Sequence, residues 1–244
     1  MENSLLVALS QQAALRRQMD VIANNIANMD TTAFKAERML FAEFPVAEAG
    51  IGAVRDDSLT LVRDIATVRT EADGAARQTG NPLDVAIEGE GWLSVQTPEG
   101  ERYTRNGQLR LDEQGRLVTD QGMPVLSNGG QPLFLSPLDT QITIATDGTL
   151  SSENGEIGRL RLVRFANPKD LREVEGGMFE AAAGVQPEPV DQPRLIQGAL
   201  EGSNVEPILE MTRMIEVHRT YDRVKRMIDQ ENERIKKAVQ EYSR

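Results

Sequence analysis

The sequence predicts an α plus β protein. We expect N- and C-terminal α-helices that pair as a coiled coil, with a mostly antiparallel all-β domain inserted between them. Two observations predict this arrangement. All 20 glycines fall within 50–202 and all 11 prolines within 45–207, so both ends of the chain lack the residues that most disturb a helix. The middle of the chain, in contrast, consists of short apolar runs separated by turn residues.

The same pattern predicts the domain boundaries. Residues 1–32 together with 203–244 form the helical assembly domain, and residues 81–202 form the β domain. Residues 33–80 are weakly patterned, and we expect an extended connector there with room for one strand pair.

The first helix has apolar residues at alternating steps of three and four. They are Leu5, Ala8, Leu15, Met19, Ile22, Ile26 and Met29, with Gln12 as a polar interruption. This 3.5-residue period is typical of a coiled-coil seam. A helix lying on a sheet usually has a broader apolar face, so the narrow stripe favours pairing with another helix. Periodicity alone leaves open whether that helix belongs to the same chain or to a neighbouring copy.

The last helix repeats this spacing. The positions are Met214, Val217, Tyr221, Val224, Ile228, Glu231, Ile235, Ala238 and Tyr242, with Glu231 as the interruption. Pro207 suits the first turn, where the missing N–H costs nothing.

Three asparagines interrupt the first helix at Asn24, Asn25 and Asn28. Asparagine is unfavourable inside a helix because its amide competes for backbone hydrogen bonds. Such residues are ordinary near a helix end. Alternatively, they form hydrogen bonds with tightly packed neighbouring helices.

The β domain is predicted from glycines that recur every seven to nine residues from Gly91 to Gly129. The runs between them are Trp92–Thr97, Arg102–Arg105, Gln108–Asp112, Arg116–Thr119 and Met123–Leu126, with further candidates at Gln141–Thr146 and Gly158–Phe165. Asn106-Gly107 is the strongest hairpin signal, because a tight turn there needs positive φ. We therefore expect an antiparallel meander, followed by an exposed return strand or linker over 184–194.

Charge limits the partners. The net charge is −11, of which residues 207–244 contribute +2 and the remainder −13. Such an acidic chain argues against nucleic acid or an anionic membrane surface as partner. No apolar run approaches the ~18 residues of a membrane span, so we expect no direct membrane insertion. The first ten residues lack the basic segment of a cleaved secretory signal.

The sequence contains few residues that could carry catalytic chemistry. The chain has no cysteine, and its single histidine, His218, lies beside the predicted seam. We expect no catalytic, metal or cofactor site. The alternative is an envelope glycan-binding module or glycoside hydrolase that its helical ends oligomerise, with Glu88 and Glu90 converging on Trp92. Trp92 is more typical of a core anchor.

Three segments resemble the bacterial flagellar basal-body rod and hook proteins. Residues 10–35 are similar to the family's N-terminal pattern, close to ANNxANxxTxGFK, and residues 200–221 are similar to its C-terminal signature. Residues 80–92, with 103–107, match the start of its β domain. Ala33 departs from the pattern, which usually has glycine. If that position takes positive φ, alanine costs roughly 1 kcal/mol.

The resemblance implies a structural subunit of the flagellar basal-body rod. It implies export by the flagellar type III apparatus without a cleaved signal peptide, and self-assembly in the periplasmic space with other rod subunits and further copies. Length and the modest β region are most similar to the proximal-rod class, with the distal-rod class as nearest alternative. Torque for motility would pass through terminal helices packed into the axial tube. The expected assembly residues are Leu15, Met19, Ile22, Asn24, Asn25, Ile26, Asn28, Met214, Val217, Tyr221, Val224 and Ile228.

Overall fold

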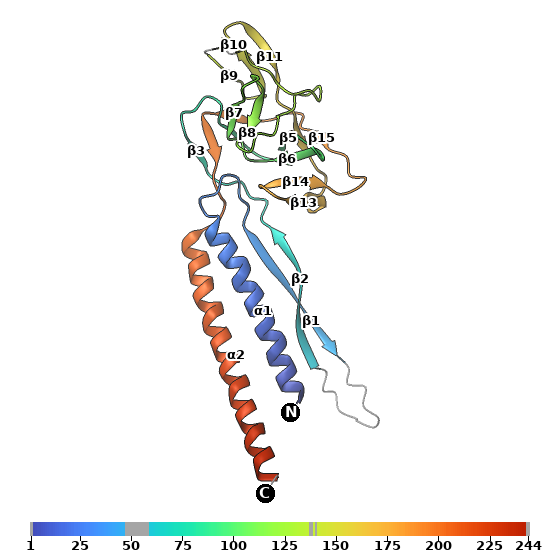
Figure 1. The fold of residues 1–244 in the computed structure, drawn as a ribbon, viewed down its shortest axis with the longest axis vertical. Coiled ribbons are helices and arrows are strands. Elements are labelled where there is room, and N and C mark those ends of the chain that lie inside the picture. The colour runs from blue at the N-terminus through green and yellow to red at the C-terminus, as the bar shows by residue number, and fades with distance from the viewer. Residues whose placement is uncertain (1, 47–58, 137–138, 140, 243–244) are drawn as a thin grey trace. The chain divides into compact units, whose positions relative to one another are not determined.

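The computed structural model describes residues 2–46, 59–136, 139 and 141–242 (Figure 1). Part of the expected connector, residues 47–58, therefore lies outside the described residues, as do the last two residues of the chain.

The chain divides into two compact units, each built from separate stretches of sequence. The helical unit comprises residues 1–29, 36–70 and 205–244, and the β unit comprises residues 30–35 and 71–204.

The helical unit contains two long helices and one hairpin. Its elements are α1 (Glu2–Ala27), β1 (Glu37–Val46), β2 (Leu59–Arg69) and α2 (Pro207–Tyr242). The helices contact each other and run in opposite directions (Figure 1). Terminal helices that pack together, with a mostly antiparallel β region between them in the sequence, confirm the predicted fold class.

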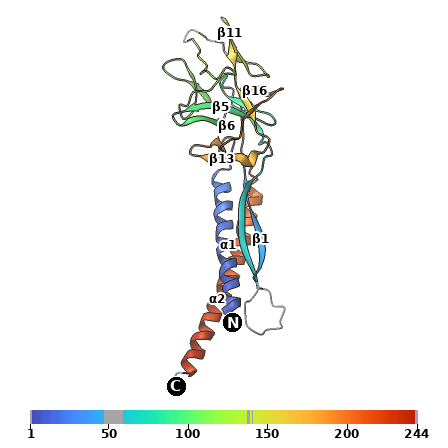
Figure 2. The same cartoon turned by 90° about the vertical axis from the view of Figure 1, so that its right-hand side faces the viewer.

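The hairpin of the helical unit pairs β1 with β2 in antiparallel register from Glu37↔Arg69 to Val46↔Leu59. A bulge interrupts the register after Leu40. The hairpin lies beside α1, which contacts both strands (Figures 1 and 2). It falls within the range that the sequence indicated as a weakly patterned connector.

The β unit consists of short antiparallel strands. They are β3 (Ala76–Gln78), β4 (Val85–Ile87), β5 (Trp92–Thr97), β6 (Gly100–Thr104), β7 (Leu109–Leu111), β8 (Leu117–Thr119), β9 (Thr143–Ile144), β10 (Thr149–Ser152), β11 (Gly155–Arg159), β12 (Leu162–Arg164), β13 (Leu171–Val174), β14 (Met178–Ala181), β15 (Glu188–Pro189), β16 (Leu195–Gln197) and β17 (Ala199–Glu201), with a 3-10 turn at Pro168–Asp170. The largest sheet has the order β13-β14-β6-β5-β12-β15, and β11-β10-β9 form a smaller one. The remaining strands form the pairs β16–β4, β17–β3 and β7–β8.

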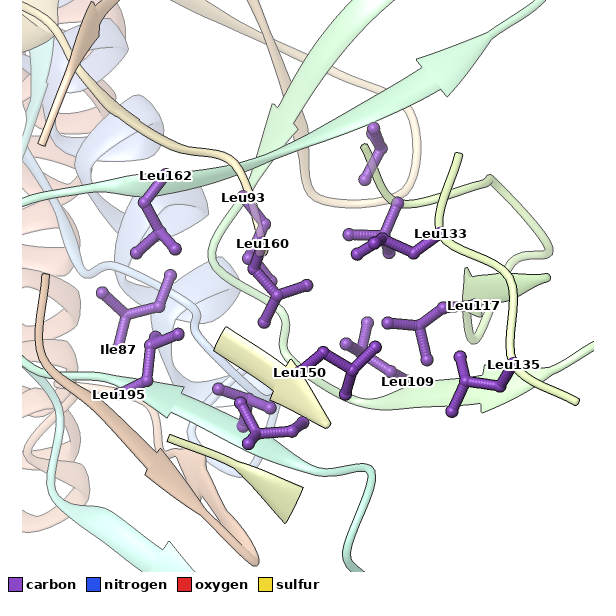
Figure 3. Close-up of a cluster of buried hydrophobic side chains, with 14 residues drawn as sticks. Ile87, Leu93, Leu109, Leu117, Leu133, Leu135, Leu150, Leu160, Leu162 and Leu195 are labelled. Atoms are coloured by element: carbon purple, nitrogen blue, oxygen red, sulfur yellow. The ribbon is translucent and has the colours of Figure 1, made fainter. Parts of the chain in front are cut away.

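The main core of the β unit is aliphatic. Leucines from many short strands converge in it, including Leu93, Leu117, Leu150 and Leu160, each at most 1% exposed (Figure 3). Completely buried side chains of this size each contribute ~1.5–3 kcal/mol, so this cluster supplies most of the unit's hydrophobic stabilisation.

The predicted meander is partly wrong. Strands β5 and β6 form a hairpin, as do β7 and β8, but β6 and β7 belong to different sheets. Asn106-Gly107 therefore makes no hairpin turn, and Gly107 does not take positive φ. A Cβ at Gly107 would lie 1.7 Å from the Val85 carbonyl oxygen, so the glycine is needed for close approach to β4. In the predicted run 123–126, residues 124–126 form isolated bridges rather than a strand.

Ala33 has a φ of 59° and is the only non-glycine residue with positive φ in the described chain. Its N–H donates to the Glu201 carbonyl at 2.9 Å, which fixes the backbone in this conformation. This explains why the family pattern has glycine here, and it identifies a local strain in this chain.

We predict that Ala33→Gly stabilises the β unit. Relief of left-handed strain gives about 1–2 kcal/mol, and the greater freedom of glycine in the unfolded chain takes back about 0.4–1 kcal/mol. The net gain in the free energy of unfolding should be about 0.5–1 kcal/mol, measured by urea unfolding followed through Trp92 fluorescence. Ala145→Gly, at a position without positive φ, should instead destabilise. Equal effects of the two changes would contradict this account.

Candidate assembly interface

The predicted seam lies largely between the two helices of the same chain. Ala8, Val224 and Ile228 form a buried cluster, and Leu5 and Leu15 pack against it. Among the other predicted seam residues, Ile22 and Val217 are buried, while Met19, Ile26, Met214 and Tyr221 are half-buried. Periodicity left open whether each helix pairs within the chain or with a neighbouring copy. For the buried cluster, the partner helix belongs to the same chain.

Asn25 connects three elements of the helical unit. Its side-chain oxygen accepts the Glu37 N–H at 2.9 Å, and its amide nitrogen donates to the Glu37 carbonyl at 2.9 Å. The amide thus pairs with the first residue of β1 as a neighbouring strand would. The same nitrogen lies 3.4 Å from the Glu210 carboxylate on α2. Asn25 is 1% exposed, so these bonds form away from water.

The other two asparagines differ from Asn25. Asn24 is exposed, and Asn28 is half-buried and donates from its side chain to the Asn24 carbonyl at 3.0 Å, near the end of α1. Glu210 is 5% exposed and also forms an ion pair with Arg213 one turn along α2.

We predict that Asn25→Ala destabilises the helical unit by about 2–4 kcal/mol, because it leaves buried backbone groups of Glu37 and the Glu210 carboxylate without a partner. The measurement is denaturant unfolding followed by circular dichroism of the helices. The control is Asn24→Ala, which should change stability by less than about 0.5 kcal/mol at an exposed position. If both variants unfolded alike, Asn25 would have no special role.

Several large apolar side chains remain exposed outside the seam. At the start of α2, Ile208, Met211 and Ile215 are 83%, 48% and 53% exposed, and we call them the outer stripe. Their spacing of three and four places them on one face of the helix. Ile208 and Val217 are nine residues apart, and therefore lie on opposite sides of the helix at about 100° per residue. The outer stripe consequently faces away from the seam.

The last part of α2 extends past the start of α1. Helix α2 is 36 residues long, whereas α1 is 26 residues long. Every residue of 232–241 is exposed. We call residues 232–241 the overhang, which projects beyond the start of α1 (Figure 2). Ile235 and Val239 in the overhang are 41% and 62% exposed. Ile235 continues the seam past Ile228.

On α1, Leu6 and Leu9 are 58% and 45% exposed. Sequence reasoning selected the seam and missed these residues and the outer stripe. The signal was present as a second apolar spacing, 208–211–215, out of phase with the first.

The alternative hypothesis, a glycan-binding or glycan-cleaving site, requires Glu88 and Glu90 to converge on an accessible Trp92. Trp92 is 6% exposed and packs edge-on against Phe165, with ring centroids 5.7 Å apart. A cavity of about 500 Å³ is lined by Glu90 and Trp92, and Glu88 and Glu90 both line a second hollow. Trp92 is thus a core anchor that leaves little of its ring accessible as a platform for a sugar.

Tyr103 belongs to the same aromatic cluster. Its ring lies 4.9 Å from that of Phe165. Burial raises the pKa of Tyr103 to about 12, the nearby Glu101 carboxylate acts in the same direction, and Arg161 opposes them.

This shift predicts alkaline sensitivity. The unfolded state loses the Tyr103 proton near pH 10, whereas the folded state keeps it until about pH 12. Stability should therefore fall as pH rises through this window, because the unfolded state binds fewer protons. The measurement is urea unfolding at a series of pH values, and Tyr103→Phe should show a smaller decline. An identical decline in the variant would exclude Tyr103 as its source.

The remaining candidates for chemistry are His218 and the acidic side chains that could bind a metal ion. His218 is exposed, and its Nδ1 lies 3.4 Å from the Asp222 carboxylate one turn along α2. Over the described residues, no group of three or more His, Asp or Glu side chains is placed to hold a metal ion. No helix in that part of the chain is long and apolar enough to cross a membrane.

Three family models match the chain. Residues 5–35 match the model of the flagella basal body rod protein, and residues 86–152 match the D1 domain of the flagellar hook protein FlgE/F/G. Residues 196–241 match the C-terminal model of the flagellar basal body rod FlgEFG protein. The two terminal models thus cover most of the two helices that form the helix pair.

Curated relatives match almost the entire length. The flagellar basal-body rod protein FlgF of Caulobacter vibrioides is 36% identical, with 98% of each chain covered. FlgF of Salmonella typhimurium is 35% identical over 98% of each chain. The flagellar basal-body rod protein FlgG of Bacillus subtilis is 31% identical, again over 98% of each chain.

Proposed function

Because this chain belongs to the family of bacterial flagellar basal-body rod proteins, we propose that it is a structural subunit of the rod that polymerises through its terminal helices into the axial tube that transmits torque. It is 36% and 35% identical to the two FlgF proteins and 31% identical to the FlgG protein, which supports a subunit of the FlgF type. We propose no enzymatic activity for it.

The observation that carries the proposal is the outer stripe of α2. A helix that already buries its seam against α1 has no intramolecular need for three more apolar side chains on the opposite side. Exposed apolar residues that cluster in this way are typical of protein–protein contacts. The outer stripe, the overhang and the pair Leu6 and Leu9 are surfaces with different residues at different places on the helix pair. Contacts between unlike surfaces produce open helical polymers wherever the rotation between neighbouring subunits does not close into a ring.

The predicted seam residues have an indirect role in this proposal. Seam residues such as Ile22, Val217 and Val224 build the helix pair, and Asn25 fixes the hairpin to it. The helix pair then presents the exposed apolar residues in a fixed geometry to neighbouring subunits. Asn24, which is exposed, and Asn28, which is half-buried, are candidates for hydrogen bonds with those subunits.

The proposed partners are other rod subunits and further copies of this chain. Family membership supports a place in the basal-body rod, and we extend it to the periplasmic space and to export by the flagellar type III apparatus. The acidic charge of −11 supports partners other than nucleic acid.

We predict that Ile208→Asp and Ile215→Asp each abolish swimming without changing the fold of the free chain. Both side chains are exposed, so the helix content and the unfolding of the purified protein should match the original. In an assembled rod, a carboxylate would enter an apolar contact and weaken it by several kcal/mol. The measurement is motility of a strain that depends on the variant.

The matched control is Gln230→Asp, which adds the same charge at an exposed position of the same helix. It should leave swimming intact. Normal motility of the Ile208 and Ile215 variants at normal protein levels would refute the role of the outer stripe.

A further inference from the structure

Charged side chains are buried where separate segments of the β unit meet. Lys35, Arg105 and Glu201 are 7%, 5% and 2% exposed, although they are ionisable. Glu201 is the centre of this group. One carboxylate oxygen accepts from Lys35 Nζ at 2.6 Å and from the Gly74 N–H at 3.1 Å, and the other accepts from Arg105 Nε at 2.8 Å.

Asp73 completes the group and balances its charge. Its carboxylate lies 3.0 Å from Arg105 Nη2 and 3.8 Å from Lys35 Nζ. Two cations and two carboxylates therefore neutralise one another, and we call Lys35, Asp73, Arg105 and Glu201 the ion cluster. The Asp73 side chain is 41% exposed, whereas the other three members are buried. Removal of a buried member leaves an uncompensated charge in the site, and burial of such a charge is very unfavourable.

The ion cluster joins segments that are distant in sequence. Lys35 is in the segment 30–35, which we call the strap, and Glu201 is the last residue of β17. The remaining two members are Asp73 and Arg105. The backbone next to Asp73 lies so close to the backbone next to Glu201 that a Cβ at Gly74 would lie 1.9 Å from the Gly202 carbonyl oxygen.

The strap is held mainly by polar contacts. The Ala33 N–H donates to the Glu201 carbonyl at 2.9 Å, and the Asn204 N–H donates to the Phe34 carbonyl at 3.3 Å. Lys35 Nζ also donates to the Ala72 carbonyl at 2.8 Å. The two hydrophobic clusters identified in the β unit contain no residue of the strap. Segments with few buried apolar contacts open at lower free energy than the core.

We propose that the ion cluster is a latch that holds the strap on the β unit, and that it opens as one local unit while the hydrophobic core stays folded. Lys35 closes the latch because it supplies the positive charge that Glu201 and Asp73 need beside Arg105. Without Lys35 the site retains two carboxylates and one cation. Opening then becomes favourable because it returns the unbalanced charge to water.

The latch would act on the segment that connects α1 to β1. Residues 28–36 link these elements, and the strap occupies most of that link. When the latch is closed, residues 30–35 are held on the β unit and the link is ordered. When the latch is open, these residues leave the β unit. The latch acts in the free chain, so its test does not depend on the proposed assembly.

The test is native-state hydrogen exchange of the full chain, with three amides reporting on the latch and two on the core. The latch amides are those of Ala33, Gly74 and Asn204, and the core amides are those of Leu117 and Val125, which bond within the β domain. We expect the latch amides to exchange through a smaller opening than the core amides. In Lys35→Met they should exchange on the order of 100-fold faster, with the core amides unchanged.

Two further variants make the test specific for charge balance. Glu201→Gln should give the same local loss, because it leaves Lys35 and Arg105 facing each other. The double variant Lys35→Met/Glu201→Gln retains the pair Arg105 and Asp73, so its loss should be smaller than the sum of the single losses. Arg172→Met removes a surface ion pair with Glu180 and should leave all five amides unchanged.

Three outcomes would overturn the proposal. In the first, the latch and core amides accelerate together in Lys35→Met, so that opening is global. In the second, the latch amides do not respond to either single variant. In the third, the losses add in the double variant, so that the charges are not coupled.

Discussion

The packing of α1 against α2 is the constraint on which the rest of the structure depends. Their seams come from opposite ends of the sequence, and burial of Ala8, Val224 and Ile228 requires the two ends to meet. Everything between them must then leave the helix pair and return to it. Segments far apart in sequence consequently lie side by side, such as those that carry Lys35 and Glu201. The fold is in this sense an insertion into a helical hairpin.

Much of the architecture is predictable because it is encoded locally. A 3.5-residue spacing reports a buried helical stripe without knowledge of the partner, and glycine-spaced apolar runs report strands such as β5 and β8. Trp92 was correctly interpreted as a core residue, since a lone large aromatic residue in a strand usually packs inside. These signals predict the fold class, the helix pair and several strands of the β domain, whereas strands such as β4, β13 and β14 lie in no predicted run.

Other features depend on contacts between distant residues and were not predictable. The hairpin β1–β2 has little alternation of its own, and it is positioned by Asn25 twelve residues before Glu37. Asn106-Gly107 has the composition of a tight turn, yet its glycine serves close approach to Val85. The charges around Glu201 were spread over the sequence as ordinary polar residues. For the candidate interface, the seam was identified, but only the structure separates side chains already covered, such as Val224, from those still exposed, such as Ile208.

The unequal lengths of the helices give the helix pair a polarity. At one end, Asn25 of α1 meets Glu210 near the first turn of α2, so the two helices finish together. At the other end α2 continues alone. At one end the two helices therefore stop together, and at the other end α2 projects alone and carries side chains of both charges. A subunit with unlike ends cannot be reversed in an assembly without changing its contacts. A filament of such objects has two chemically different tips, and the direction of growth is set by which tip accepts the next object.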